Sequence, residues 1–223
     1  MPTDANPLIR QDYRPVPGWS LIVFGLALPV IGYAVVRLLP NREMMTVLGA
    51  FFLIGLLAVI VAVAPLGKAA FPALGLRPAN WKYPVLGAFG TLFLSVAVSQ
   101  IGIEPQGMKQ VIEVVREPHE LILSLLLLSV LAPIVEELVF RGLILAGFMS
   151  RMNWVWAVIA QGIVFGIAHV DPARGAGNVG LALILSSVGV VFGGAAYLLR
   201  RIAPTMLAHA ILNAIVLVVV LTR

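Results

Sequence analysis

Charged and amide side chains stand inside apolar stretches in the C-terminal half of this 223-residue chain. They are Glu136, Glu137 and Arg141 in one stretch, His169 at the end of the next, and His209 and Asn213 in the last. A charge at the centre of a membrane helix costs at least about 2.5 to 3.5 kcal/mol on insertion scales. Residues kept at such a cost indicate a functional site, and carboxylates with imidazoles are groups that move protons or bind metals.

The first of these stretches carries two adjacent carboxylates and an arginine. At about 100° per residue, Glu137 and Arg141 lie roughly 40° apart on a helix, whereas Glu136 and Arg141 lie roughly 140° apart. Glu137 is therefore predicted to pair with Arg141 at the i, i+4 spacing. Glu136 is left free, as expected of a carboxylate that takes a proton from water and later returns it.

The two histidine motifs are Phe165-x-x-x-His169 and His209-x-x-x-Asn213, and the second places both of its residues on one helical face. Neutral imidazole binds a metal or shuttles a proton near neutral pH. An asparagine one turn away can ligate a metal, position water, or donate to a developing oxyanion. Structural explanations stay open for each residue alone, because histidine, asparagine and a Glu–Arg pair in a membrane often only join or stabilise helices.

The rest of the sequence predicts that these motifs lie in a membrane. Hydrophobic residues make up 61% of the chain and charged residues 11%, against about 45 to 50% and 25% in soluble domains. The predicted spans are residues 19–39, 44–65, 81–103, 120–149, 153–169, 179–199 and 203–221. Because a lone strand in lipid would leave its backbone groups unpaired, the predicted fold class is all-α, a polytopic transmembrane helix bundle of about seven spans.

Four regions follow from this pattern. Residues 1–18 form a polar, proline-rich tail, and residues 19–103 hold three N-terminal transmembrane helices. Residues 104–119 make a polar connection with a short interfacial helix before the fourth span. Residues 120–221 form the helix bundle that contains all three motifs. The chain has no cysteine, which excludes disulfides, cysteine-ligated zinc and a thiol nucleophile.

The net charge of +5 does not indicate nucleic-acid binding, because the basic residues stand singly or in pairs between apolar blocks. They are better explained as topology signals. A cytoplasmic N-terminus would place a small excess of Lys and Arg on the inner side, which favours that orientation. Membrane lipid is therefore a predicted partner, and nucleic acid is not.

In this order, on three separate apolar spans, the motifs resemble those of the CPBP family. This family comprises the CAAX proteases and bacteriocin-processing enzymes, including type II CAAX prenyl endopeptidases and Abi-type bacterial proteins. The resemblance covers about residues 120–220, and all three motifs are intact. It makes residues 120–221 a CPBP-like catalytic bundle.

The resemblance also implies roles for individual residues. Glu136 would activate the hydrolytic water, assisted by His169. His209 and Asn213 would form the oxyanion-stabilising side of the site or complete a metal site. The supporting positions would be Glu137, Arg141 and Phe165.

A divalent metal, with zinc as the first candidate, is implied because the family is usually classed as metalloprotease-like. The zinc-protease signature His-Glu-x-x-His is absent from the sequence. Glu136, His169 and His209 would supply three N or O ligands and leave a fourth position open for water. A metal-free mechanism with Glu and His is chemically possible as well.

The expected function is an intramembrane endopeptidase in the cell membrane of a bacterium or archaeon. Its substrates would be membrane-associated peptides or proteins, such as prenylated CAAX chains or bacteriocin or pheromone precursors. One alternative is a non-catalytic Abi-like scaffold or bacteriocin self-immunity protein, in which polar residues tie helices together. Another is a small transporter, because intramembrane Glu, Arg and His also mark ion paths.

Overall fold

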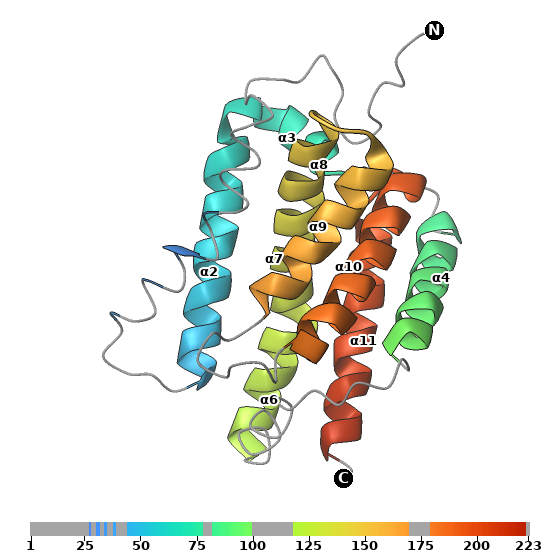
Figure 1. Ribbon diagram of the computed structural model, residues 1–223. Helices are drawn as coiled ribbons and strands as arrows, with labels where there is room; N and C mark the ends of the chain where they lie inside the picture. Colours follow the sequence, from blue (N-terminus) through green and yellow to red (C-terminus); the bar gives the residue numbers. More distant parts are fainter. Residues whose placement is uncertain are drawn as a thin grey trace, which may run out of the picture.

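The computed structural model describes residues 44–77, 82–99, 118–169 and 179–221, together with isolated positions between residues 27 and 38. Every regular element in this part of the chain is a helix (Figure 1), so the predicted all-α fold class is confirmed there. The predicted tail, most of the first predicted span and the predicted interfacial helix up to residue 117 lie outside the described residues.

The described helices fall into three groups along the chain. The first consists of α2 (Met44–Val63), the 3-10 helix η2 (Ala64–Ala69), α3 (Ala70–Ala73) and α4 (Lys82–Ser99). The second is one long helical path made of α6 (Pro118–Leu126), η3 (Leu127–Leu131), α7 (Ala132–Glu137), η4 (Leu138–Leu145) and α8 (Ala146–Met149). The third consists of α9 (Trp154–Ala168), α10 (Val179–Leu199) and α11 (Ala203–Leu221).

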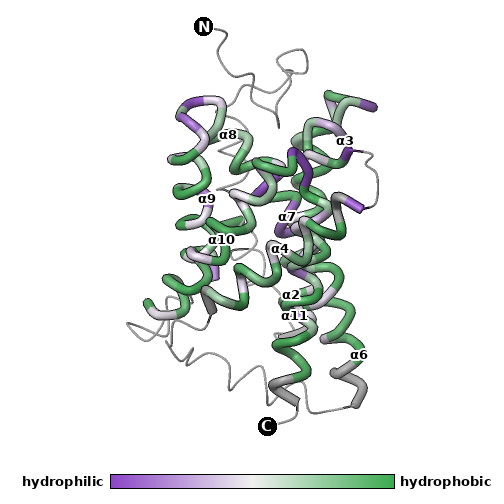
Figure 2. The backbone as a smooth tube through the Cα atoms, turned by 90° about the vertical axis from the view of Figure 1, so that its right-hand side faces the viewer, coloured by the Kyte–Doolittle hydropathy of each residue, from purple (hydrophilic) through white to green (hydrophobic). Residues whose placement is uncertain are grey.

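The outer surface of these helices is apolar, as expected of helices that contact lipid. Three segments are long and apolar enough to cross a membrane: Leu48–Ala73, Ile122–Met149 and Val179–Leu199. Shorter apolar helices cover Val85–Ala97, Trp154–Ala168 and Ala203–Val218. Large apolar side chains are exposed on these segments, and hydrophobic residues cover most of the chain in Figure 2. The protein is an integral membrane helix bundle, while the total of seven spans stays a prediction.

The long path from Pro118 to Met149 runs through the middle of the bundle (Figure 1), and α2, α9, α10 and α11 contact its α7 or η4 part. The apolar pattern alone predicts a regular α-helix here, but η3 and η4 adopt the wider π-helical register. Pro133 has no N–H to offer the carbonyl four residues earlier, which accounts for the change of register before α7. π-Helical turns recur at functional sites, and here they flank both carboxylates.

Facing glycines let α9 and α10 approach each other closely. Gly162 and Gly166 of α9 stand four residues apart, as do Gly189 and Gly193 of α10, in the small-xxx-small pattern of packed membrane helices. A Cβ atom on Gly162 would lie 2.8 Å from the Ser186 carbonyl oxygen, and one on Gly189 would lie 2.9 Å from Gly162 Cα. This contact fixes α9, and with it the histidine at its C-terminal end, against α10.

A tight turn joins α10 to α11. Arg200 adopts a left-handed conformation with φ of 55°, and Ile202 is fully buried just before α11 begins. α11 then packs against α4, η3 and α7. The turn therefore brings the first half of α11, which carries His209, alongside the two carboxylates of α7.

Candidate active site

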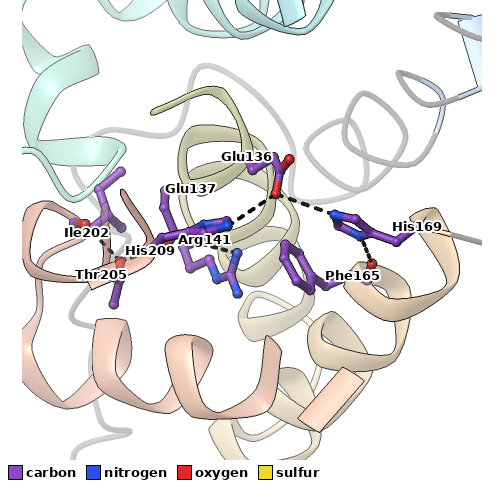
Figure 3. Close-up of polar contacts among 8 residues, drawn as sticks. All are labelled: Glu136, Glu137, Arg141, Phe165, His169, Ile202, Thr205 and His209. Carbon is purple, nitrogen blue, oxygen red and sulfur yellow. Dashed lines mark hydrogen bonds and ion pairs between the residues drawn. The ribbon is translucent and has the colours of Figure 1, made fainter. Parts of the chain in front are cut away.

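Glu136 and Glu137 are neighbours at the end of α7, but their side chains enter different surroundings (Figure 3). The Glu137 side chain is fully buried, whereas 14% of the Glu136 side chain is exposed. The two carboxylates therefore have different sets of contacts, although His209 lies against both.

One cation and two hydrogen-bond donors, from two helices, surround the Glu137 carboxylate. Its Oε1 lies 2.9 Å from Nη1 of Arg141 and 3.1 Å from Nδ1 of His209. Its Oε2 accepts a hydrogen bond from the Thr205 hydroxyl at 2.7 Å. The predicted pairing of Glu137 with Arg141 is thus confirmed, and the same carboxylate also joins α7 to α11.

The guanidinium of Arg141 is fully buried, and two of the three aromatic rings around it lie closest. Its Cζ lies 4.5 Å from the centre of the Phe165 ring and 5.2 Å from the centre of the Phe192 ring. A planar guanidinium near aromatic faces gains cation–π and stacking energy. The two rings therefore stabilise the cation that neutralises Glu137, and Phe165, one of the predicted supporting positions, contacts another of them, Arg141.

His169 caps the C-terminal end of α9. Its Nδ1 lies 2.7 Å from the carbonyl oxygen of Phe165. Because a carbonyl oxygen can only accept, Nδ1 carries the hydrogen and donates it. The other ring nitrogen, Nε2, points to Oε2 of Glu136 at 3.6 Å, and 30% of the imidazole side chain remains exposed.

His209 approaches the same carboxylate from α11. Its Nε2 lies 3.7 Å from Glu136 Oε2, while its Nδ1 donates to Glu137. Among the described residues, Glu136 Oε2 has no hydrogen-bond partner. One carboxylate oxygen therefore faces two imidazole nitrogens, and a reacting group placed beside that oxygen can contact all three side chains.

Asn213 lies one turn beyond His209 on α11, as predicted, but its recorded contact is with a different element. Its side-chain amide donates to the carbonyl oxygen of Leu128 at 2.8 Å. The bond ties α11 to the π-helical segment η3. An amide group has two hydrogens, so one remains for another acceptor, and the catalytic role of Asn213 stays a prediction.

The donor types in this site suit a divalent cation. Both histidines donate Nδ1–H to an oxygen, which is the outer contact that metal-binding histidines usually have. Within the described residues, however, no group of three or more His, Asp or Glu side chains has the arrangement of a metal site. The mechanism below is derived from the side chains alone, and the predicted metal stays a prediction.

Two residues of the site were not among the sequence predictions. Thr205 precedes His209 by four residues, so its position on the same helical face was a usable signal. Phe192 carried no such signal, because it stands among other apolar residues of α10. Its contact with Arg141 depends on how closely α10 packs, which the sequence pattern does not specify.

Comparisons with known proteins agree with the geometry. The family described as "Type II CAAX prenyl endopeptidase Rce1-like" matches residues 118–215, which include all three motifs. A Bacillus subtilis (strain 168) protein named "Putative membrane peptidase YdiL" is 26% identical over 218 residues, which cover 97% of this chain and 75% of that protein. No solved structure gives a significant match. The matched segment carries the three motifs whose carboxylates and imidazoles meet in one site, and over these residues the chain is similar to CAAX-type membrane proteases.

Proposed function

We propose that this protein is an intramembrane endopeptidase in which Glu136 activates the hydrolytic water. One observation carries the proposal: Glu136 Oε2 lacks a hydrogen-bond partner in the described part of the chain and faces Nε2 of His169 at 3.6 Å and of His209 at 3.7 Å. A carboxylate that served only to join helices would have its donors, as Glu137 does.

Hydrolysis begins with a water molecule beside Glu136. The carboxylate takes a proton from the water while the water oxygen bonds to the scissile carbonyl carbon, and the carbonyl π electrons move onto its oxygen. The C–N bond then breaks, and the proton held by Glu136 passes to the leaving amine. One water is consumed, and the carboxylate is restored.

The two histidines and Asn213 assist this reaction by orienting the water or by stabilising the oxyanion. His169 Nε2 accepts the second hydrogen of the water and so orients the attacking lone pair toward the carbonyl carbon. His209, with a hydrogen on Nε2, donates to the oxyanion, and the second amide hydrogen of Asn213 is available on the same helix. Donors fixed in a site without bulk water stabilise the developing charge more than they would in solution.

The substrates in this proposal are membrane-associated chains, because the site lies among apolar helices. Prenylated CAAX peptides and bacteriocin or pheromone precursors are the classes that the family resemblance favours. We place the protein in a bacterial or archaeal cell membrane with its N-terminus in the cytoplasm.

The proposal is tested without a known substrate by comparing protein termini in host membranes that contain wild type or Glu136→Ala at matched levels. Uncut precursors should accumulate only with the variant. Glu120→Ala is the matched control, because it removes a carboxylate from the first turns of the same helical path, in α6. Identical termini in wild-type and Glu136→Ala membranes would overturn the mechanism.

The predicted metal has its own test. The family resemblance leads us to expect one zinc per chain by elemental analysis, loss of cleavage after dialysis against a chelator, and recovery when zinc is returned. Full activity in metal-depleted protein would assign the whole reaction to side chains.

The scaffold alternative also has an observation in its favour. Glu137 joins η4 and α11 through Arg141, His209 and Thr205, which is how a purely structural polar network would be built. If the protein is a scaffold, Glu136→Gln leaves the host phenotype unchanged. Glu137→Gln would then remove the function together with the folded protein.

A further inference from the structure

Thr205 lies in the first turns of α11 and is fully buried. Its hydroxyl oxygen is 2.7 Å from Glu137 Oε2 and 2.8 Å from the carbonyl oxygen of Ile202. A threonine hydroxyl has a single hydrogen to donate. The two acceptors therefore compete for it.

The backbone decides this competition in favour of Glu137. The Ile202 carbonyl already accepts a hydrogen bond from the Met206 backbone N–H at 2.9 Å. Within the described part of the chain, Oε2 of Glu137 has no other donor, because Arg141 and His209 both contact Oε1. A buried carboxylate oxygen without a donor is costly, so the hydroxyl hydrogen belongs to Glu137.

The hydroxyl thereby fixes the plane of the carboxylate. With Oε2 held by α11 and Oε1 held by Arg141 of η4, the Glu137 side chain cannot rotate without losing a contact at both oxygens. Oε1 is also the acceptor for Nδ1 of His209. The orientation of the imidazole, whose Nε2 points to Glu136, thus depends on the orientation of Glu137.

We propose that Thr205 is a positioning residue that acts through Glu137 to hold the His209 ring with Nδ1–H on Glu137 and Nε2 toward Glu136. Its effect on catalysis rests on the proposed peptidase function. Its effect on the His209 hydrogen bond does not. The two consequences are therefore measured separately.

Thr205→Val and Thr205→Ser separate the hydroxyl from the packing. Valine keeps the branched shape and removes the donor, whereas serine keeps the donor and loses a methyl group. Thr91→Val is the matched control, because Thr91 is also a buried threonine bonded to a helix carbonyl, that of Gly87, and lies on α4. If Thr205→Val does not yield folded protein, Thr205→Ala is compared with Thr205→Ser instead, because these two variants both lack the methyl group and differ only in the hydroxyl.

The first measurement is the His209 Nδ1–H signal in spectra of detergent-solubilised protein labelled with ¹⁵N-histidine. The signal is assigned with His119→Ala and His169→Ala variants. Wild type, Thr205→Ser and Thr91→Val should show a hydrogen-bonded Nδ1–H that exchanges slowly with water. In Thr205→Val it should exchange fast or disappear. An unchanged signal in folded Thr205→Val would overturn the proposal.

The second measurement is kinetic and uses a substrate from the termini comparison. Loss of an outer contact of this kind typically costs about 10-fold or more in activity, so kcat of Thr205→Val should fall by about 10-fold with KM nearly constant. Thr205→Ser should recover most of the loss. A merely structural threonine would lower the yield of folded protein in Thr205→Val while kcat per folded molecule stayed at the wild-type value.

Together, the two measurements distinguish a failure of the peptidase proposal from a failure of the Thr205 proposal. If wild type cleaves nothing but the Nδ1–H signal depends on the Thr205 hydroxyl, the peptidase proposal is wrong and the positioning of His209 stands. If wild type cleaves and neither readout responds to Thr205→Val, the peptidase proposal stands and the role of Thr205 is wrong.

Discussion

The two adjacent carboxylates of α7 differ in what their surroundings leave them free to do. Glu137 is fully buried and has recorded donors at both oxygens, supplied by η4 and α11. Glu136 is partly exposed and has two imidazole nitrogens directed at an oxygen that lacks a donor among the described residues. Successive helix residues point about 100° apart, so neighbours in sequence can serve different purposes. The first carboxylate is placed to hold helices together, and the second is placed to react.

The largest expected effect belongs to Glu136 and is confined to activity. Glu136→Gln keeps the shape of the side chain but removes the proton acceptor, so kcat should fall by about 10²- to 10⁴-fold. The thermal unfolding midpoint in detergent should stay close to wild type, because no hydrogen bond to Oε2 is lost. Glu120→Gln, the control with the same chemical change, should retain activity. A kcat near wild type in Glu136→Gln would show that Glu136 is not the reactive carboxylate.

Arg141→Met should have the opposite signature, with stability falling first. The substitution leaves the Glu137 carboxylate buried without its cation, and breaking a buried pair in this way typically costs about 3 to 5 kcal/mol. Unfolding of purified protein in mixed micelles measures the loss. Arg200→Met, at an exposed arginine in the turn after α10, should change stability by less than about 0.5 kcal/mol. Equal losses in the two variants would contradict a structural role for the Glu137 pair.

The sequence predicts best those features that depend on local spacing. Residues 179–199 and 203–221 were predicted as spans and are α10 and α11, because polar residues flank each apolar block. The Glu137–Arg141 pair was predictable for the same reason, since both residues lie one turn apart on one helical path. The second predicted span, residues 44–65, includes α2, but the apolar path continues to Ala73 beyond a turn at Gly67 with φ of 52°.

Features that depend on contacts between helices were not predictable from spacing. Nothing local indicates that His169 and His209, on separate helices, both reach Glu136; only the family resemblance brought them together. The contact of Phe192 with Arg141 requires α10 to pack against η4, and the hydrogen bond from Asn213 to Leu128 requires α11 to pack against η3. Each of these contacts joins residues on different helices, so the spacing within one helix does not predict it.

The smallest expected effect concerns the aromatic rings that hold Arg141. Phe192→Leu removes one ring near the guanidinium, and the cation–π part of the loss should be about 0.5 to 2 kcal/mol. That part is isolated by measuring Phe192→Leu in both wild-type and Arg141→Met backgrounds, because the packing loss is common to both. Phe52→Leu is the control, since Phe52 is also buried but its recorded ring partner is Phe51. Coupling should appear for Phe192 and not for Phe52. Zero coupling for both would mean that the Phe192 ring only fills space beside the guanidinium, and that the cation depends on its ion pair with Glu137 and on the nearer Phe165 ring.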